Sequence, residues 1–496
     1  MNVADISQNP PADAAGLTFR SDYEPKIDSN EKARIADVAH HILLERPRLD
    51  RLPPFGPHCR QGLVDAPSLL IEDHSGIQLA HEHGADQHLS YRAALLAGDG
   101  DLLAVYGERE PAFEAYCRDV LGLGNFRVIA PPIADPIQSL ARACIADGTL
   151  LEAAAASASR AGALNLLPYM TTGAIWLLAA EIGYRAGVPV FVAGPNPQLV
   201  RAVNDKLWFA RWAARLLGKE AVPENRSVYG MAALVGHMRR FMTQHRAIGL
   251  KLSHSAASLG NMVLASEDYA GLSPNVVAGR LRDLMAQRGW RNPFPLQLTA
   301  WEGPLLGSPS VQSWIPHVAE GPPIVEAVFD QATRGSAARF IGGMPSGFGY
   351  ALQTKLAHEA ACLATLFQSL GFFGRCSFDA VVIGEDETTA KLHWVECNGR
   401  WGGMSLPMTL ANRLIGDWRA RGFLVFSHRD ERLIGLDLAE VLSRCDKLLF
   451  RAGQKGGLVI LTPGQFAIGR LDCLVLASDQ AAAREIAERT AHQLAE

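Results

Sequence analysis

Residues 393–403, HWVECNGRWGG, contain an acid, an amide and a guanidinium at alternate positions. Glu396, Asn398 and Arg400 are spaced two residues apart, so on an extended strand their side chains leave the same face. Burying three such groups is costly unless each has a polar or charged partner. The face must therefore either contact solvent or bind something charged.

The segment before this stretch is predicted to pair with it as an antiparallel hairpin. Two apolar runs, FDAVVI and LHWV, are separated by the polar, turn-rich GEDETTAK. If the hairpin closes symmetrically, Ile383 pairs with Leu392 and Asp379 lies directly opposite Glu396. The sequence thus predicts two carboxylates facing each other across neighbouring strands.

Opposed carboxylates indicate a cation site. They repel each other, and the pKa of one of them rises unless a cation lies between them. Asn398 adds a neutral oxygen on the same face, and oxygen ligands completed by water and phosphate suit Mg²⁺. Asp379, Glu396 and Asn398 are therefore candidate Mg²⁺ ligands, and we expect Glu396→Gln to leave the metal-free protein as stable or more stable. The alternative is a solvated strand face in a register shifted by one residue.

The composition is typical of a soluble globular protein with two or three domains. The 496 residues are 48% hydrophobic and 20% charged, which argues against extensive disorder. A net charge of -4 offers no basic surface to a nucleic-acid backbone. We therefore expect no nucleic-acid partner.

Neither a secretory signal nor a membrane span is predicted. The N-terminal stretch lacks a basic region followed by an apolar one, and the run ALNLLPYMTTGAIWLLAAEIGY is interrupted by polar residues and ends beside an acid. That run is typical of a buried helix. Eight cysteines without a CxxC pair indicate free thiols in a reducing compartment, so a cytoplasmic location is expected.

The chain divides into four regions of α/β and α+β character. Residues 1–60 combine a polar tail with one amphipathic helix, and residues 61–200 alternate strands and helices as in a parallel α/β domain. Residues 201–415 mix hairpin-like strands with helices. Residues 416–496 are predicted to form a small α+β appendage.

The acidic hairpin resembles the terminal metal-binding segment of the ATP-grasp superfamily. The matching segment is GFFGRCSFDAVVI…LHWVECNGRWGG. In that family a strand Asp and a Glu-x-Asn strand hold two Mg²⁺ ions, and Asp379, Glu396 and Asn398 match those positions. Arg400 matches an arginine that several members carry just after this motif. The resemblance implies that Arg400 stabilises charge on the transferred phosphoryl group or on an acyl phosphate.

Two upstream segments resemble the phosphate-binding lysines of the same family. NDKLWFARWAARLLGKEAVP resembles the segment in which a lysine starts a helix, here Lys206. GLKLSHSAASLGN resembles the strand lysine and the flexible glycine loop that follows it, here Lys251 and a loop ending at Gly260. The family lysines neutralise the α- and β-phosphates of ATP. Each lysine alone is typical of a solvated surface, but their order and spacing before the acidic hairpin support the resemblance.

The adenine-binding hinge of the family corresponds to LQLTAWEGPLLGSPSVQSWIP. The resemblance makes Glu302, at the end of a predicted strand, the candidate adenine-side residue, with Trp301 packing beside it. Many members carry another acid for the ribose hydroxyls at the start of the next strand. This chain has Ser308 and Ser310 there instead.

The resemblance covers roughly residues 65–415 and implies a pre-ATP-grasp α/β domain followed by an ATP-grasp fold, with two α+β subdomains enclosing ATP. The segment LLPYMTTGAIWLLAAEIG and the C-terminal appendage look most like the peptide-ligase branch found in small-molecule biosynthesis. The implied activity is an ATP- and Mg²⁺-dependent ligase. It would join a carboxylate, such as an amino acid or small acid, to an amine through an acyl phosphate, forming an amide or peptide bond.

Two other functions remain open at this point. An alcohol acceptor in the same site would make the protein a small-molecule kinase, and a subunit without turnover would only bind nucleotide. The joint presence of Asp379, Glu396, Asn398 and Arg400 argues against the binding subunit, because binding alone needs fewer of them. The sequence names neither the carboxylate nor the amine. A homodimer is compatible with the sequence, which does not fix the oligomeric state.

Overall fold

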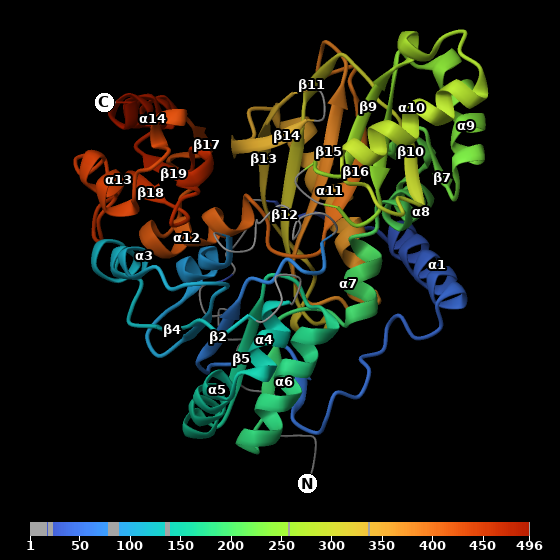
Figure 1. Ribbon diagram of the computed structural model, residues 1–496. Helices are drawn as coiled ribbons and strands as arrows, with labels where there is room; N and C mark the ends of the chain where they lie inside the picture. Colours follow the sequence, from blue (N-terminus) through green and yellow to red (C-terminus); the bar gives the residue numbers. More distant parts are fainter. Residues whose placement is uncertain are drawn as a thin grey trace.

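The computed structural model describes residues 17, 23–77, 89–133, 139–255, 258–335 and 338–495. Most of the expected N-terminal tail, residues 1–16 and 18–22, lies outside these ranges. The predicted helix after the tail is α1 (Ser29–Glu45), which begins at a capping box formed by Asp28 and Glu31. Figure 1 shows a large central sheet, with a smaller sheet beside it and a parallel sheet beneath it. Within the described residues, no helix is long and apolar enough to cross a membrane.

The first sheet is entirely parallel and has the order β1-β6-β5-β2-β3-β4. Its strands are β1 (Cys59–Gln61), β2 (Ser68–Ile71), β3 (Leu102–Ala104), β4 (Arg127–Ile129), β5 (Leu164–Pro168) and β6 (Val190–Val192). Its helical segments are η3 (Ser90–Leu96), α3 (Pro111–Ala115), η4 (Tyr116–Val120), α4 (Leu140–Ala146), α5 (Gly148–Ala161) and α6 (Gly173–Ala186). Strands buried on both faces with helical crossovers are what parallel pairing requires. The expected parallel α/β architecture is confirmed. The run predicted as one buried helix instead holds strand β5 followed by α6, and α6 buries one face while Leu177 and Tyr184 are exposed.

A small antiparallel sheet follows, in the order β7-β10-β8-β9. Its strands are β7 (Asn225–Val228), β8 (Ala247–Leu252), β9 (Asn261–Ala265) and β10 (Leu296–Ala300). The accompanying helical segments are α7 (Pro197–Val203), α8 (Lys206–Leu217), η5 (Lys219–Ala221), α9 (Met231–Gln244), η6 (Ser266–Tyr269) and α10 (Pro274–Gln287). The hairpin-like pair predicted around Lys251 is present as β8 and β9.

The large sheet has the order β11-β15-β12-β13-β14-β17-β19-β18, with β16 paired to β15. Its strands are β11 (Leu305–Gly307), β12 (Pro309–Ile315), β13 (Ile324–Arg334), β14 (Arg339–Pro345), β15 (Gly374–Ile383), β16 (Lys391–Asn398), β17 (Gly422–Arg429), β18 (Gly457–Ile460) and β19 (Arg470–Ala477). Its helical segments are η7 (Val318–Glu320), α11 (Tyr350–Ser369), α12 (Ser405–Ile415), η8 (Glu431–Leu433), α13 (Leu438–Arg444), η9 (Phe466–Ile468) and α14 (Gln480–Ala495). The C-terminal strands thus extend the same sheet through the pairing of β14 with β17.

The C-terminal region also packs against the first domain. One buried apolar cluster joins Tyr91 and Phe113 to Phe423 and Leu474, which are far apart in the sequence. The Ile460 backbone N–H donates to the Tyr116 hydroxyl at 3.0 Å in the same cluster. In Figure 1, α3 lies beside α12 and α13. The first domain and the C-terminal strands therefore share one apolar core, which holds them in contact with each other.

Candidate active site

The acidic hairpin consists of β15 and β16, and Asp379 is paired with Glu396. The predicted opposition of these two carboxylates is confirmed. The symmetric register behind the prediction is wrong, because Ile383 pairs with Lys391 and not with Leu392. A bulge makes up the difference: Ala380 pairs with Trp394, so Val395 has no partner before Asp379 meets Glu396.

The bulge decides which side chains of β16 enter the site. Trp394 and Cys397 both lie in the apolar core although they are three residues apart. Glu396 and Asn398 instead line a cavity of about 680 Å³, together with Arg400. A regular strand would put Trp394 and Glu396 on the same face, so the bulge is what turns the acid away from the core.

Asp379 is held by neutral hydrogen-bond donors. Ser310 Oγ donates to its Oδ1 at 2.6 Å, Gln331 Nε2 donates to the same oxygen at 2.9 Å, and Asn398 Nδ2 donates to Oδ2 at 2.9 Å. Burial and the facing carboxylate of Glu396 raise the pKa of Asp379 to about 7. The acid therefore exchanges its proton near neutral pH when no cation is bound.

Glu396 is held in the opposite way, by an ammonium group. Lys206 Nζ lies 2.8 Å from Glu396 Oε2 and also donates to the Ser255 carbonyl at 2.7 Å. Burial alone would raise the pKa of Glu396, but Lys206 and Lys251 outweigh it and lower that pKa to about 2. The two facing carboxylates thus have very different pKa values, because only Glu396 is in contact with a cationic side chain.

Lys251 lies on β8 and lines the same cavity as Glu396. Its side chain is buried, and its ammonium nitrogen is 5.6 Å from the centre of the Trp301 ring. Burial lowers the pKa of Lys251 to about 8, with Glu396 opposing that shift and Lys206 adding to it. Because this ammonium group is desolvated, a nearby anion such as a phosphate would strongly stabilise its charged form.

Gly260 supports the loop between β8 and β9. A Cβ at this position would lie 2.0 Å from Ser255 Oγ, so only glycine allows the loop to return this close. Its carbonyl accepts a hydrogen bond from the Leu252 backbone N–H at 2.9 Å. Gly260 itself does not line the cavity, whereas Leu259 and Asn261 do. Its contact with a nucleotide stays a prediction.

Glu302 follows β10 and lines the cavity beside Trp301. His393 Nδ1 lies 2.6 Å from Glu302 Oε2. Burial raises the pKa of Glu302, but the contact with His393 lowers that pKa by a larger amount. The net shift is therefore downward. Ser310, one of the two serines that stand where many family members carry a ribose-binding acid, donates its hydroxyl to Asp379.

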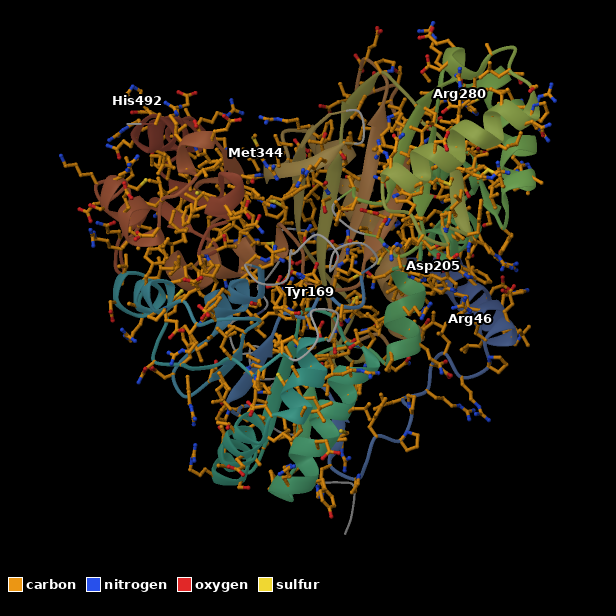
Figure 2. The ribbon with its side chains drawn as sticks, viewed as in Figure 1. Arg46, Tyr169, Asp205, Arg280, Met344 and His492 are labelled. Carbon is orange, nitrogen blue, oxygen red and sulfur yellow. The ribbon has the colours of Figure 1, made fainter. Side chains whose placement is uncertain are left out.

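Arg400 connects the acidic hairpin to the first domain. Its Nε donates to the Tyr169 hydroxyl at 3.2 Å and its Nη1 donates to Asn204 Oδ1. Tyr169 directly follows β5 at the carboxyl end of the parallel sheet, and Figure 2 shows it near the centre of the molecule. Sequence reasoning missed Tyr169, although carboxyl ends of parallel strands are where such sheets place functional residues.

A buried polar network lies behind Tyr169. His74 packs edge-on against the Tyr169 ring with 4.3 Å between ring centres, and its Nε2 is 2.9 Å from Glu72 Oε1. Arg92 Nε donates to the same Glu72 oxygen at 2.9 Å. Burial raises the pKa of Tyr169, but Arg400, His74 and Arg92 outweigh it and the net shift is downward. The first domain thus presents positive charge around the phenol that holds Arg400.

Comparison with known proteins is consistent with this architecture. Residues 90–184 match the Pre ATP-grasp domain family, and no curated protein matches the chain. The structure is similar to that of an N5-carboxyaminoimidazole ribonucleotide synthetase in complex with ADP, at 15% identity and a TM-score of 0.51, over 88% of this chain and 98% of that one. The chain has the ATP-grasp fold.

A second similar structure is a biotin carboxylase in complex with beta-gamma-ATP from Campylobacter jejuni. It is 13% identical, with a TM-score of 0.50 over 84% of this chain and 89% of that one. The biotin carboxylase domain of the Hydrogenobacter thermophilus 2-oxoglutarate carboxylase is 11% identical, with a TM-score of 0.50 over 85% of this chain and 89% of that one. The expected fold, a pre-ATP-grasp domain followed by ATP-grasp α+β structure, is confirmed. The boundaries at residues 200 and 415 stay predictions.

Proposed function

We propose that this ATP-grasp protein uses ATP to activate a small-molecule carboxylate and joins it to an amine. The observation that carries the proposal is the convergence of the Asp379–Glu396 pair, Lys251 and Arg400 on one cavity. The similar structures described above include an ADP complex and a beta-gamma-ATP complex, which supports a nucleotide in this fold. A solvated surface would not need two buried lysines, one of them paired with a partly buried carboxylate.

The donor set fits Mg²⁺. Asp379 and Glu396 supply two carboxylates on adjacent strands, and Asn398 supplies an amide beside them. The raised pKa of Asp379 is expected of an acid that faces another acid with no cation between them. These three residues would hold Mg²⁺, which would supply positive charge to neutralise the phosphates of ATP.

Lys251 and Lys206 are assigned different roles. Lys251 lines the cavity as a desolvated ammonium, and we assign it to the phosphates of ATP. Lys206 does not line the cavity itself but keeps Glu396 ionised through their 2.8 Å contact, and a direct contact of Lys206 with ATP stays a prediction. Glu302 and Trp301 are assigned to the adenine side, because they follow β10 at the edge of the same cavity. These interactions position ATP and require no covalent enzyme intermediate.

Arg400 is assigned to the reacting groups. Tyr169 and Asn204 occupy two of its donor nitrogens, which orients the guanidinium and leaves further N–H groups to bind an anion. In the proposed reaction a carboxylate oxygen attacks the γ-phosphorus of ATP and ADP leaves. The amine then attacks the acyl carbon, loses a proton and expels inorganic phosphate. A fixed guanidinium stabilises the charge that develops in both steps.

Trapping with hydroxylamine tests the proposal. The protein is incubated with Mg²⁺-ATP, a pooled mixture of amino acids and small acids, and hydroxylamine, and the products are identified by mass spectrometry. Ligation through an acyl phosphate should give ADP together with a hydroxamate of one acid. A stable phosphorylated product with ADP would instead show a kinase. Saturable ATP binding without ADP formation in any mixture would indicate a nucleotide-binding subunit.

A further inference from the structure

Four arginines lie at the same end of four neighbouring strands of the large sheet. The strands β13, β14, β17 and β19 are adjacent in that order. Arg334 pairs with Arg339 across β13 and β14, and Arg429 pairs with Arg470 across β17 and β19. The register between β14 and β17, continued to the strand ends, brings Arg339 level with Arg429. We call these four residues the arginine row.

The positive charge of the arginine row is largely unbalanced. Arg334, Arg339 and Arg429 form no ion pair or side-chain hydrogen bond with any residue that the structure describes. Arg470 is partnered by Asp472, with 2.9 Å between Nη2 and Oδ2. Burial and the charges of Arg339 and Arg470 lower the pKa of Arg429, with a smaller contribution from Arg334. Like charges opposite each other across strands destabilise a sheet unless an anion separates them.

The arginine row reaches the reaction cavity through two of its four members; Arg334 and Arg429 lie exposed at the strand ends and do not line it. Arg339 and Arg470 line the same cavity as Asp379 and Glu396. The row depends on close contact between β14 and β17, where a Cβ on Gly342 would lie 2.1 Å from the Val425 carbonyl oxygen. Gly342 has a φ of +151°, which glycine tolerates best.

The end of β14 is fixed on its other side too. Met344, labelled in Figure 2, lies on β14, and Gln480 Nε2 of α14 is 3.8 Å from its Sδ. The strand that carries Arg339 therefore contacts strand β17 at Gly342 and helix α14 at Met344. The juxtaposition of the arginines therefore follows from the pairing of the strands.

We propose that the arginine row binds an anionic group, a phosphate or a carboxylate, carried by the amine substrate. Guanidinium groups bind both anions through paired N–H donors. Arg400 is already assigned to the reacting carboxylate. The arginine row, on another wall of the cavity, would therefore bind a second anionic group. The identity of this ligand as a substrate rests on the proposed ligase function. The acceptor class is then an amine that also carries a phosphate or a carboxylate.

Anion titration of matched variants tests the row directly. The wild-type protein, Arg339→Gln/Arg429→Gln and the control Arg444→Gln/Arg451→Gln are each titrated by calorimetry with inorganic phosphate and, separately, with succinate. Saturating Mg²⁺-ADP is present to occupy the nucleotide site. The control removes the same number of positive charges elsewhere in the C-terminal region, where Arg444 and Arg451 are paired with Glu440 and Asp446. Melting curves confirm that all three proteins are folded.

We expect wild type to bind at least one anion saturably, the row variant to bind it at least about tenfold more weakly, and the control to stay within about twofold. Tighter binding of phosphate would identify a phosphate-bearing amine, and tighter binding of succinate a carboxylate-bearing one. The proposal is overturned if wild type binds neither anion, or if the control weakens binding as much as the row variant.

A kinetic measurement separates this proposal from the ligase function. With an active amine, the row variant should raise the KM for the amine at least about tenfold and leave the KM for ATP unchanged. A wild-type protein that forms no ADP would reject the ligase function but not the titration result. Ligation with equal KM for the amine in wild type and row variant would reject only the role of the row.

Discussion

Lys206 Nζ lies 2.8 Å from Glu396 Oε2, so the first residue of α8 pairs with the acid of β16. The side chains of Lys206 and Glu396 are 5% and 27% exposed. The contact explains how the sheet holds two facing carboxylates. Glu396 stays ionised beside its ammonium partner, while Asp379, with neutral donors, has the raised pKa.

Glu396→Gln should destabilise the ligand-free protein by about 1–3 kcal/mol, because Lys206 would lose its counter-charge; partial exposure of Glu396 keeps the cost below that of a fully buried pair. The ion pair argues against the sequence-based expectation that this change would leave stability unchanged or higher. Asp379→Asn is the control and should be as stable as wild type or more stable, since it removes the carboxylate without a cationic partner. Urea unfolding measures both, and equal losses in the two variants would contradict the pairing.

The ligand-free protein should lose stability between about pH 4 and pH 7 through Asp379. The folded pKa of this carboxyl is about 7, above the ~3.9 of an unfolded aspartate. The folded state therefore holds the proton in this window, and the associated stability is lost as the pH rises through the folded pKa. Glu396 has a lowered pKa and contributes only at lower pH. Urea unfolding at several pH values should show a flatter slope in Asp379→Asn, and an unchanged slope would refute the assignment.

Lys251→Met should weaken ATP binding at least about tenfold and leave the fold as stable or more stable. The reason for the second part is the lowered pKa of Lys251, which shows that the folded state disfavours its charge when no anion is present. Lys206→Met should weaken ATP binding and also destabilise the fold, because Glu396 would lose its partner. Calorimetry with ATP and urea unfolding provide both values. Unchanged ATP affinity in both variants would remove the phosphate-binding role of these lysines.

Arg400→Lys should bind ATP nearly as wild type does and turn over at least about a hundredfold more slowly, because a point charge cannot replace a planar fork held at two donors. The readout is kcat compared with the dissociation constant for ATP. A proportional loss of ATP affinity would place Arg400 in ground-state nucleotide binding instead.

Tyr169→Phe should lower kcat by roughly tenfold with little effect on the KM for ATP, since the hydroxyl that orients Arg400 is lost. Tyr184→Phe is a matched control, because Tyr184 is 81% exposed on α6. In the double variant Tyr169→Phe/Arg400→Lys, the loss of kcat should be smaller than the product of the losses in the two single variants. Fully additive losses would show that the phenol acts independently of Arg400.

The hairpin shows how far the sequence alone could go. The polar turn and the flanking apolar runs were enough to predict that Asp379 faces Glu396, and the structure confirms it. The register was wrong nearer the turn, where Ile383 pairs with Lys391. A single bulged residue, Val395, cannot be read from apolar alternation, because it shifts the pairing without changing the composition.

Contacts between segments far apart in the sequence could not be predicted, for a different reason. Tyr169 reaches Arg400 only because the first sheet packs beside the large one, and no local pattern encodes that packing. The pairing of Lys206 with Glu396 likewise joins segments 190 positions apart. The arginine row depends on β14 meeting β17, a pairing between strands that are not neighbours in the chain. Local periodicity predicts elements, whereas such contacts require the order of strands in the sheet.

Transfer of ¹⁸O tests the central claim most directly. A pooled set of amino acids and small acids labelled with ¹⁸O in their carboxyl groups is incubated with the protein, Mg²⁺-ATP and candidate amines, and the inorganic phosphate is analysed by mass spectrometry. Activation through an acyl phosphate predicts one ¹⁸O atom in each phosphate released, together with ADP and an amide product. ADP formed with unlabelled phosphate, or with the phosphoryl group retained on a stable product, would contradict carboxylate ligation.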